Sequence, residues 1–227
     1  MNKVYILHGW AYSTEKWKPF LKLLGEGGLD YELLKIPGLT APLDRVWELS
    51  DYVDWLKSEV DKNASKVVLL GHSNGGRISL AFARIYPTKV SHLILIDSAG
   101  IYHKDIFLQI KRLTFGSLAN FKRIINNTFL RDLFYKIVRE YDYNRASPIM
   151  KKVLQNLIES DVDNPLEKVN VPTLIIWGER DNITPLSDGK LMNNLIRNSR
   201  LFIIKGAKHS PQFTNTQEVF DILKDNL

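Results

Sequence analysis

The sequence predicts an α/β fold, a doubly wound and mainly parallel sheet of six strands that is covered by helices on both faces. Two observations lead to this prediction. Short, continuous apolar runs, which are typical of buried parallel strands, alternate with longer segments in which apolar residues recur every three or four positions, as in helices. This alternation stops once, between residues 101 and 164, and then resumes, which indicates one core with an insertion.

The first hundred residues contain four predicted strands and three predicted helices. The apolar run that starts at Val4 is ended by His8-Gly9, and the run that starts at Tyr31 is ended by Pro37-Gly38, since Gly and Pro interrupt regular structure. Strands are predicted at residues 4–7, 31–36, 66–70 and 90–96, and helices at 15–25, 44–60 and 74–86.

The rest of the chain holds the insertion and the end of the core. Residues 101–164 show only helical patterns, rich in aromatic and basic side chains, and we expect them to form a helical cap over one end of the sheet. Residues 1–100 and 165–227 are then assigned to the core. Its last strands are predicted at residues 171–178 and 200–204, and its last helices at 185–196 and 211–227.

The composition is that of an ordinary globular protein, with 44% hydrophobic and 25% charged residues among 227. No apolar run is long enough for a membrane span or a signal peptide, and the chain has no cysteine, which fits a cytoplasmic protein without disulfides. The net charge is +6, but the basic residues form no block. We therefore expect neither nucleic acid nor a membrane as partner, and predict no particular oligomeric state.

A serine stands in a glycine-bounded turn between the third predicted strand and the following helix. The stretch reads Gly71-His72-Ser73-Asn74-Gly75, and Gly-x-Ser-x-Gly in a strand–turn–helix context is typical of nucleophilic serines. The turn is so tight that a Cβ at either glycine would clash with the backbone. Ser73 is therefore predicted to be a nucleophile in a strained conformation, with its hydroxyl projecting into solvent.

A serine nucleophile needs a neighbouring base, and His209 is the predicted base. Ligands of doubly wound sheets bind at the carboxyl ends of the strands, and His209 lies in the loop after the last predicted strand. Each of the other four histidines is less suitable: His8 is expected to make a structural hydrogen bond, His72 lies inside the serine turn, His92 starts a strand and His103 lies in the insertion.

A third group must orient the histidine, and two carboxylates follow predicted strands. Asp181 comes after the fifth strand and gives the chain order serine, acid, histidine. Asp97 comes after the fourth strand and is the competing candidate; its other interpretation is a helix cap or turn former, with a role in holding the junction with the insertion. Asp181 is predicted to be the acid.

Acyl transfer also requires two backbone N–H groups that face the developing oxyanion. Asn74 follows the nucleophile at the start of a helix and supplies one of them; Trp10, in the loop after the first strand, is predicted to supply the other. The sequence shows no metal-ligand spacing, and residues 71–76 lack the lysine of a phosphate loop. Neither a metal nor a cofactor is expected.

These motifs resemble the α/β-hydrolase superfamily, in its branch of lidded serine esterases and carbon–carbon hydrolases. The resemblance runs from Val4 to the C-terminus and rests on His8-Gly9-Trp10, the serine turn, Val171 to Asp181, and Gly206 to His209. It implies a triad of Ser73, Asp181 and His209, an oxyanion hole of the Trp10 and Asn74 N–H groups, and a cap at residues 101–164. The family usually opens with two further strands, so residues 31–36 are expected at a sheet edge.

The expected activity is hydrolysis of carboxylic esters of small or medium acyl groups, through the triad and an acyl-enzyme. Two alternatives stay open at this point. The same triad serves carbon–carbon bond hydrolases and lyases, and the segment from Gly71 to Leu95, with Arg77, resembles a menaquinone-pathway synthase. A hydrolase-fold binding protein without turnover is the third reading, against which the complete Ser, Asp and His set argues.

Overall fold

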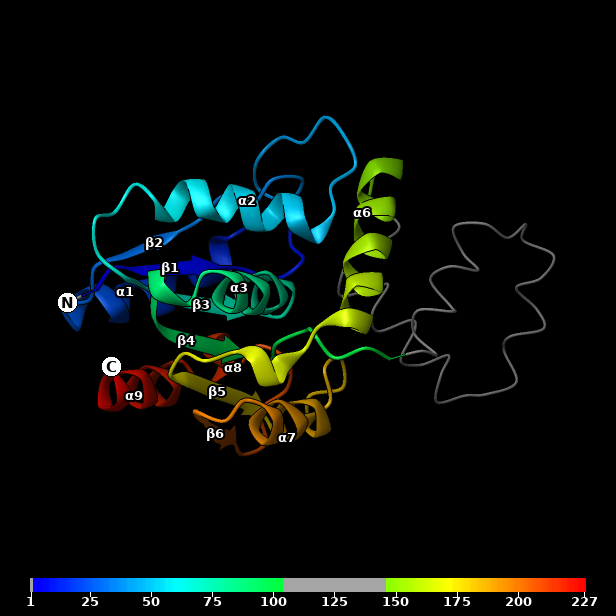
Figure 1. Ribbon diagram of the computed structural model, residues 1–227. Coiled ribbons are helices and arrows are strands. Elements are labelled where there is room, and N and C mark those ends of the chain that lie inside the picture. The colour runs from blue at the N-terminus through cyan, green and yellow to red at the C-terminus, as the bar shows by residue number, and fades with distance from the viewer. Residues whose placement is uncertain (1, 104–145) are drawn as a thin grey trace.

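The computed structural model describes residues 2–103 and 146–227, which form one α/β unit (Figure 1). Its sheet has six strands in the order β2-β1-β3-β4-β5-β6, and each neighbouring pair is parallel. The predicted sheet is therefore confirmed. The strands are β1 Val4–Leu7, β2 Tyr31–Leu33, β3 Val67–His72, β4 Val90–Ile96, β5 Thr173–Gly178 and β6 Ser199–Ile204.

The edge position expected for the second strand is also confirmed, because within the described residues β2 pairs with β1 alone. The strand is shorter than predicted: it ends at Leu33 rather than residue 36. Beyond it the chain folds into a tight turn, in which the N–H groups of Leu39, Thr40 and Ala41 all approach the Ile36 carbonyl within 3.1 Å. The Ile36 N–H donates to Thr40 Oγ1, so this backbone is satisfied without a sheet partner.

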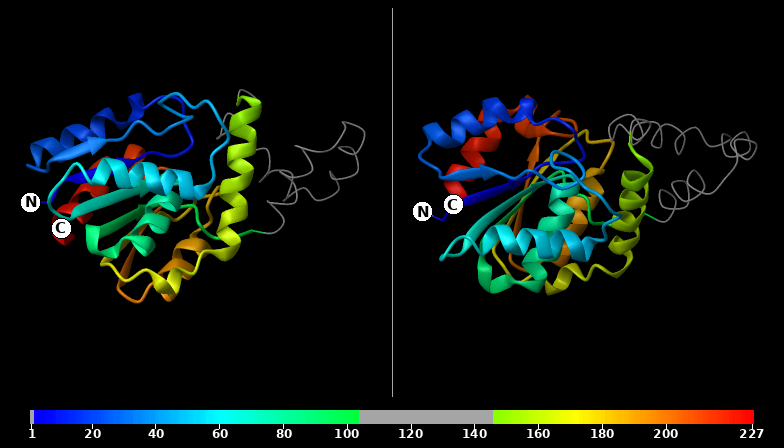
Figure 2. Two further views of the ribbon diagram at one scale, coloured as in Figure 1. Left: turned by 45° about the horizontal axis from the view of Figure 1, so that its top comes forward. Right: turned by 90° about the horizontal axis from the view of Figure 1, so that it is seen from above.

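Helices cover both faces of the sheet, and the alternation of side chains along the strands sorts the core into two halves (Figure 2). Val4 and Ile6 of β1 pack with α1 and α9, whereas Tyr5 and Leu7 pack with α2, α3 and α6. The helices are α1 Lys18–Glu26, α2 Leu49–Val60, α3 Asn74–Ile85, α6 Pro148–Glu159, α7 Leu186–Leu195, α8 Pro211–Thr214 and α9 Thr216–Asn226.

Two helix predictions need correction. The helix expected from residue 44 begins at Leu49, because Glu48 and Asp51 form a reciprocal capping box there. The closing helix expected at residues 211–227 is divided into α8 and α9 by Asn215, whose backbone (φ −125°, ψ 43°) leaves the helical region. Short 3₁₀ turns complete the described elements: η1 Glu15–Trp17, η2 Pro87–Lys89, η4 Ser160–Asp163 and η5 Leu166–Lys168.

The predicted insertion is described only in part, since residues 104–145 lie outside the described residues. Its described end, α6, stands across the end of the sheet toward which the strands point (Figure 1). Met150, Val153 and Leu157 of α6 belong to the same buried cluster as α2 and α3. The division of the chain into core and cap stays a prediction. In the described part of the chain, no helix is long and apolar enough to cross a membrane.

Candidate active site

The strand–turn–helix around Ser73 is built as the glycine pattern predicts. Ser73 has φ 52° and ψ −119°, a conformation that costs non-glycine residues energy. A Cβ at Gly71 would lie 2.5 Å from the Gly76 Cα, and one at Gly75 would lie 2.1 Å from the Leu7 carbonyl oxygen. Only glycine permits this approach of β1, β3 and α3.

The prediction of a solvent-exposed serine is wrong, because Ser73 is only 2% exposed. The loop after β1 covers it: a Cβ at Gly9 would lie 3.1 Å from the Ser73 Cβ and 2.9 Å from His72 Nδ1. Trp10, the next residue, is buried as well. The loop that carries one predicted oxyanion N–H therefore packs directly against the serine turn, where Asn74 carries the other.

The structure brings Asp181 and His209 together. His209 Nδ1 lies 2.7 Å from Asp181 Oδ2, and the Asp181 side chain is completely buried. Its oxygens also accept the N–H of Ile183 at 2.7 Å and, at 2.8 Å, the hydroxyl of Thr184. Because the Asp181 oxygens accept these two donors, we assign His209 Nδ1 as a third donor to Asp181, which leaves the lone pair of the ring on Nε2.

The competing carboxylate, Asp97, lies at the same sheet edge but accepts different donors. Its Oδ1 accepts the Gly178 N–H at 2.8 Å, and its Oδ2 accepts the Ser210 N–H at 2.7 Å. Burial, followed by the nearby charge of Asp181, raises the pKa of Asp97 to about 7. Asp97 thus ties the end of β5 to the loop of His209. A further role of Asp97 at the junction with the insertion stays a prediction.

His72 contributes more than its position inside the turn suggests. Its ring lies 4.9 Å from the His209 ring, between centroids, and its Nε2 is 3.1 Å from the Ser210 hydroxyl. Burial lowers the pKa of His72 well below its usual value, helped by the charges of His209 and His8, so the ring is neutral. Sequence reasoning missed this contact, and also Ser210 and Thr184, because nothing in a local pattern reports which loops meet.

Two other histidines have defined partners. His8 is buried and makes hydrogen-bond contacts with the Gly9 carbonyl at 2.7 Å and with Thr40 Oγ1 at 2.8 Å; burial lowers its pKa. The expected structural role of His8 is confirmed. His103 Nε2 lies 2.8 Å from Asp188 Oδ2 on α7, and this contact raises the pKa of His103.

Three of these groups lie close enough to be considered as metal ligands. One donor atom each from His72, Asp97 and His209 lies within 4.8 Å of the others. All three side chains already make hydrogen bonds inside the protein: with Ser210, with two backbone N–H groups and with Asp181. The arrangement is better explained as a hydrogen-bonded network than as a metal centre.

A buried ion pair connects the serine helix to the segment after α6. Arg77 on α3 donates to both oxygens of Asp161 on η4, from Nε and from Nη2, at 2.8 Å each. Its Nη1 donates to Asn74 Oδ1 at 2.6 Å. Both ionic side chains are almost fully buried, and bidentate pairing is the geometry that buried Arg–carboxylate pairs require.

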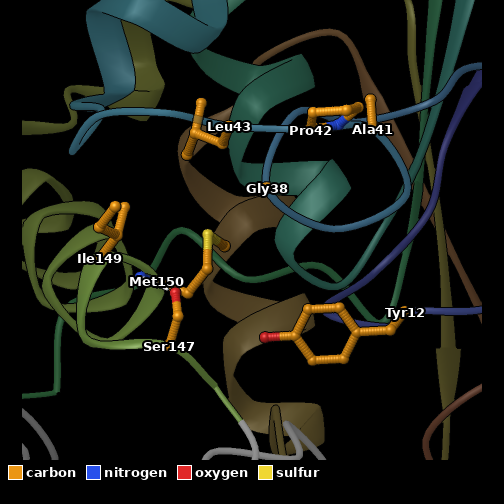
Figure 3. A pocket seen from close by; sticks show the side chains of 8 residues that line it. All are labelled: Tyr12, Gly38, Ala41, Pro42, Leu43, Ser147, Ile149 and Met150. Carbon is orange, nitrogen blue, oxygen red and sulfur yellow. Dashed lines mark hydrogen bonds between the residues drawn. The ribbon is translucent and has the colours of Figure 1, made fainter.

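A hollow of about 290 Å³ opens between the loop after β1, the loop after β2 and the start of α6 (Figure 3). Tyr12 borders it two residues after Trp10, and Met150 reaches into it from α6. The lining is mostly apolar, with Ala41, Pro42, Leu43 and Ile149 among its members. Such a hollow suits an apolar group of modest size.

Together these features define a class of protein. A strained serine between a parallel strand and a helix, followed in the chain by an acid and then a histidine that contact each other, is typical of α/β hydrolases. The family comparison agrees: the chain belongs to the alpha/beta hydrolase family, whose profile matches residues 4–222.

Individual relatives are distant in sequence. The chain is similar to a pimeloyl-[acyl-carrier protein] methyl ester esterase of Neisseria meningitidis serogroup B, with 22% identity over an alignment of 248 positions. This alignment covers 99% of this chain and 92% of that protein. A thermophilic esterase from Thermogutta terrifontis has a similar structure (TM-score 0.74, 21% identity, 99% of this chain and 89% of that chain). MenH from S. aureus is also similar (TM-score 0.70, 19% identity, 98% and 91%). At these identities the two structures show a shared fold.

Proposed function

We propose that the protein is a serine hydrolase that cleaves carboxylic esters of small or medium acyl groups, with neither metal nor cofactor. The observation that carries this proposal is the 2.7 Å contact between His209 Nδ1 and Asp181 Oδ2, at the sheet edge where Ser73 occupies its strained turn. With Asp181 holding the proton on Nδ1, the Nε2 lone pair of His209 is the group that accepts the Ser73 proton.

The reaction then takes two similar halves. Ser73 Oγ attacks the ester carbonyl as its proton passes to His209, and the N–H groups of Trp10 and Asn74 stabilise the oxyanion. His209 returns the proton to the leaving alkoxide, and an acyl-enzyme remains. Water, deprotonated by His209, attacks this acyl group. The collapse of the second oxyanion releases the acid, and His209 returns its proton to the leaving Ser73 Oγ.

We propose small or medium acyl groups from the class of enzyme that these residues resemble, because the hollow beside Tyr12 and Met150, of about 290 Å³, is not lined by any residue of the proposed triad. The name of the Neisseria relative supports the same substrate class, since it denotes the cleavage of a methyl ester of a medium-length acyl group. We further propose that residues 101–164 form the cap over the site, and that the enzyme acts on small-molecule esters in the cytoplasm.

The proposal is tested by labelling and by turnover. A fluorophosphonate probe should modify wild-type protein at the peptide that contains Ser73 and should not modify Ser73→Ala. With p-nitrophenyl esters of two to twelve acyl carbons, wild type should show a maximum at short or medium chains. Ser73→Ala should retain less than about a thousandth of that turnover, with a melting temperature within a few degrees of wild type, because alanine occupies the same backbone conformation.

Three results would contradict the proposal. Labelling at another residue would remove Ser73 as the nucleophile. Turnover of diketone substrates with carbon–carbon cleavage, but not of esters, would favour the carbon–carbon hydrolase or lyase alternative instead. A protein that binds esters without either turnover or labelling would be the inactive binding protein that is the third alternative.

A further inference from the structure

The side-chain amide of Asn74 is held at one end and unpaired at the other. Its Oδ1 accepts the N–H from Arg77 Nη1 at 2.6 Å. A guanidinium group only donates hydrogen bonds, so the carbonyl oxygen must face Arg77 and the orientation of the amide is determined. Asn74 is 1% exposed, and its Nδ2 has no hydrogen-bond partner in the described structure.

Arg77 is itself fixed, so the amide cannot relax by following it. Its Nε and Nη2 both donate to Asp161, at 2.8 Å each, and the two side chains are 6% and 2% exposed. A bidentate guanidinium–carboxylate pair defines the plane and the rotation of the guanidinium. Asp161 on η4 therefore fixes the orientation of Arg77, and Arg77 in turn fixes the orientation of the Asn74 amide, in the residue after Ser73.

A buried N–H2 group without an acceptor is unfavourable, and native proteins keep few of them. This one belongs to the residue that follows the proposed nucleophile, on the side of α3 that is tied to the segment after α6. In the proposed reaction His209 protonates the leaving alkoxide, so the alcohol side of the ester faces the loop after β6. Since the alcohol side of the ester is placed toward that loop, we assign the acyl group to the side of Asn74.

We propose that Asn74 determines specificity: its Nδ2 donates a hydrogen bond to an acceptor oxygen of the acyl group, and Arg77 and Asp161 are the positioning residues that aim it. The favoured substrates are esters whose acyl chain carries an ether, keto or carboxylate oxygen close to the scissile carbonyl. This inference rests on the proposed ester hydrolysis and adds a substrate class to it.

The test compares two esters of equal length, p-nitrophenyl butanoate and p-nitrophenyl methoxyacetate, in which an ether oxygen replaces one methylene. The quantity measured is the ratio of kcat/KM for the methoxyacetate to kcat/KM for the butanoate, divided by the same ratio for wild type, which cancels intrinsic reactivity. Asn74→Leu keeps the approximate volume and removes the donor. We expect it to lower the ratio about 3- to 10-fold, as one neutral hydrogen bond would.

Two further variants separate specificity from folding. Asn74→Asp keeps the contact with Arg77 but turns the free end into an acceptor, so its ratio should fall at least as far. Arg77→Met combined with Asp161→Leu replaces the ion pair by apolar groups, a change that buried pairs often tolerate; it retains Asn74 but releases the amide, and the ratio should fall part of the way. Thermal melts identify any variant that does not fold.

The outcomes are distinct. If the folded Asn74 variants lose activity on both esters in equal proportion, or lose none, the donor does not read the acyl group and the inference is overturned. If wild type hydrolyses neither ester, the proposed function itself fails, and this inference fails with it. In the first case wild type still hydrolyses both esters, so ester hydrolysis stands and only the role of Asn74 is wrong.

Discussion

Replacing Asp181 by asparagine tests the proposed triad well, because the surrounding donors dictate how the new amide must lie. Asp181 Oδ1 accepts the N–H of Ile183 at 2.7 Å and that of Thr184 at 3.2 Å. The asparagine must therefore keep its carbonyl oxygen at this position, since an N–H2 group there would face two donors. Its N–H2 group then takes the place of Oδ2, beside His209 Nδ1.

This orientation reverses the hydrogen bond to the imidazole. An N–H2 group donates to Nδ1, so the neutral His209 ring must carry its proton on Nε2, where it cannot accept the proton of Ser73. The same reversal in a serine-protease triad lowers kcat about 10⁴-fold. We expect Asp181→Asn to lower kcat by about 10³- to 10⁴-fold, with the fold retained because the two backbone N–H groups keep their acceptor.

Asp97→Asn is the matched control, because it makes the same chemical change at the same sheet edge. Both oxygens of Asp97 accept backbone N–H groups, from Gly178 and Ser210, and an asparagine can satisfy only one of them. The loss of one charge-assisted bond should destabilise the fold by about 1.5–3 kcal/mol. Part of this loss is offset, because the neutral asparagine removes the cost of burying a charged carboxylate, the cost that raises the pKa of Asp97 to about 7.

The assay is ester turnover by both variants at pH 8, with thermal melts under the same conditions. Asp181→Asn should be nearly inactive and fold like wild type. Asp97→Asn should melt at a lower temperature and lose no more than about 100-fold in kcat, through the displaced loop of His209. The reasoning is refuted if Asp97→Asn is the inactive protein while Asp181→Asn turns over esters at more than a tenth of the wild-type rate.

Two further predictions concern stability. Gly75→Ala should destabilise the fold by at least about 3 kcal/mol, because its Cβ would lie 2.1 Å from the Leu7 carbonyl oxygen. The control Gly28→Ala should cost only about 1 kcal/mol, because Gly28 has φ 76° and open space around it. Equal urea midpoints for the two variants would contradict this prediction. The pKa of His103, raised by its bond to Asp188, predicts a stabilisation that is present below pH 6.5 and lost as the pH rises through the raised value. His103 is part-exposed, so the gain should stay below about 1 kcal/mol, and melts of wild type and Asp188→Asn at pH 5.5 and pH 8 should differ only at the lower pH.

The sequence predicted the parts of this fold that depend on local patterns. Strands inside the sheet, such as Val4–Leu7 and Thr173–Gly178, are buried along their whole length and follow from continuous apolar runs. The serine turn follows from the spacing of Gly71 and Gly75. The start of α2 was missed because apolar spacing continues into residues 44–48, and only the capping box of Glu48 and Asp51 decides where the helix begins.

The sequence predicted only those side chains of the site whose role follows from a motif or from their order in the chain. Sequence order favoured Asp181 over Asp97, and the contact of Asp181 with His209 agrees with that choice. The pairing of Arg77 with Asp161 joins residues that are 84 positions apart, and no periodicity reports such a distance. The same holds for Asp97 and Ser210, which are 113 positions apart.

Ser210 shows how the site combines these non-local contacts. Its φ of 94° lies in the left-handed region, and it precedes Pro211, which favours extended backbone; such a residue persists only where its surroundings hold it. Two contacts do so: its N–H donates to Asp97 at the end of β4, and its hydroxyl meets His72 at the end of β3. The residue next to His209 is therefore held by two central strands as well as by its own loop, where its carbonyl accepts the Phe213 N–H at 3.0 Å. The strained backbone of Ser210 is thus stabilised by its contacts with residues at the ends of β3 and β4. We therefore expect a substitution of Asp97 to lower the stability of the fold more than it lowers the turnover.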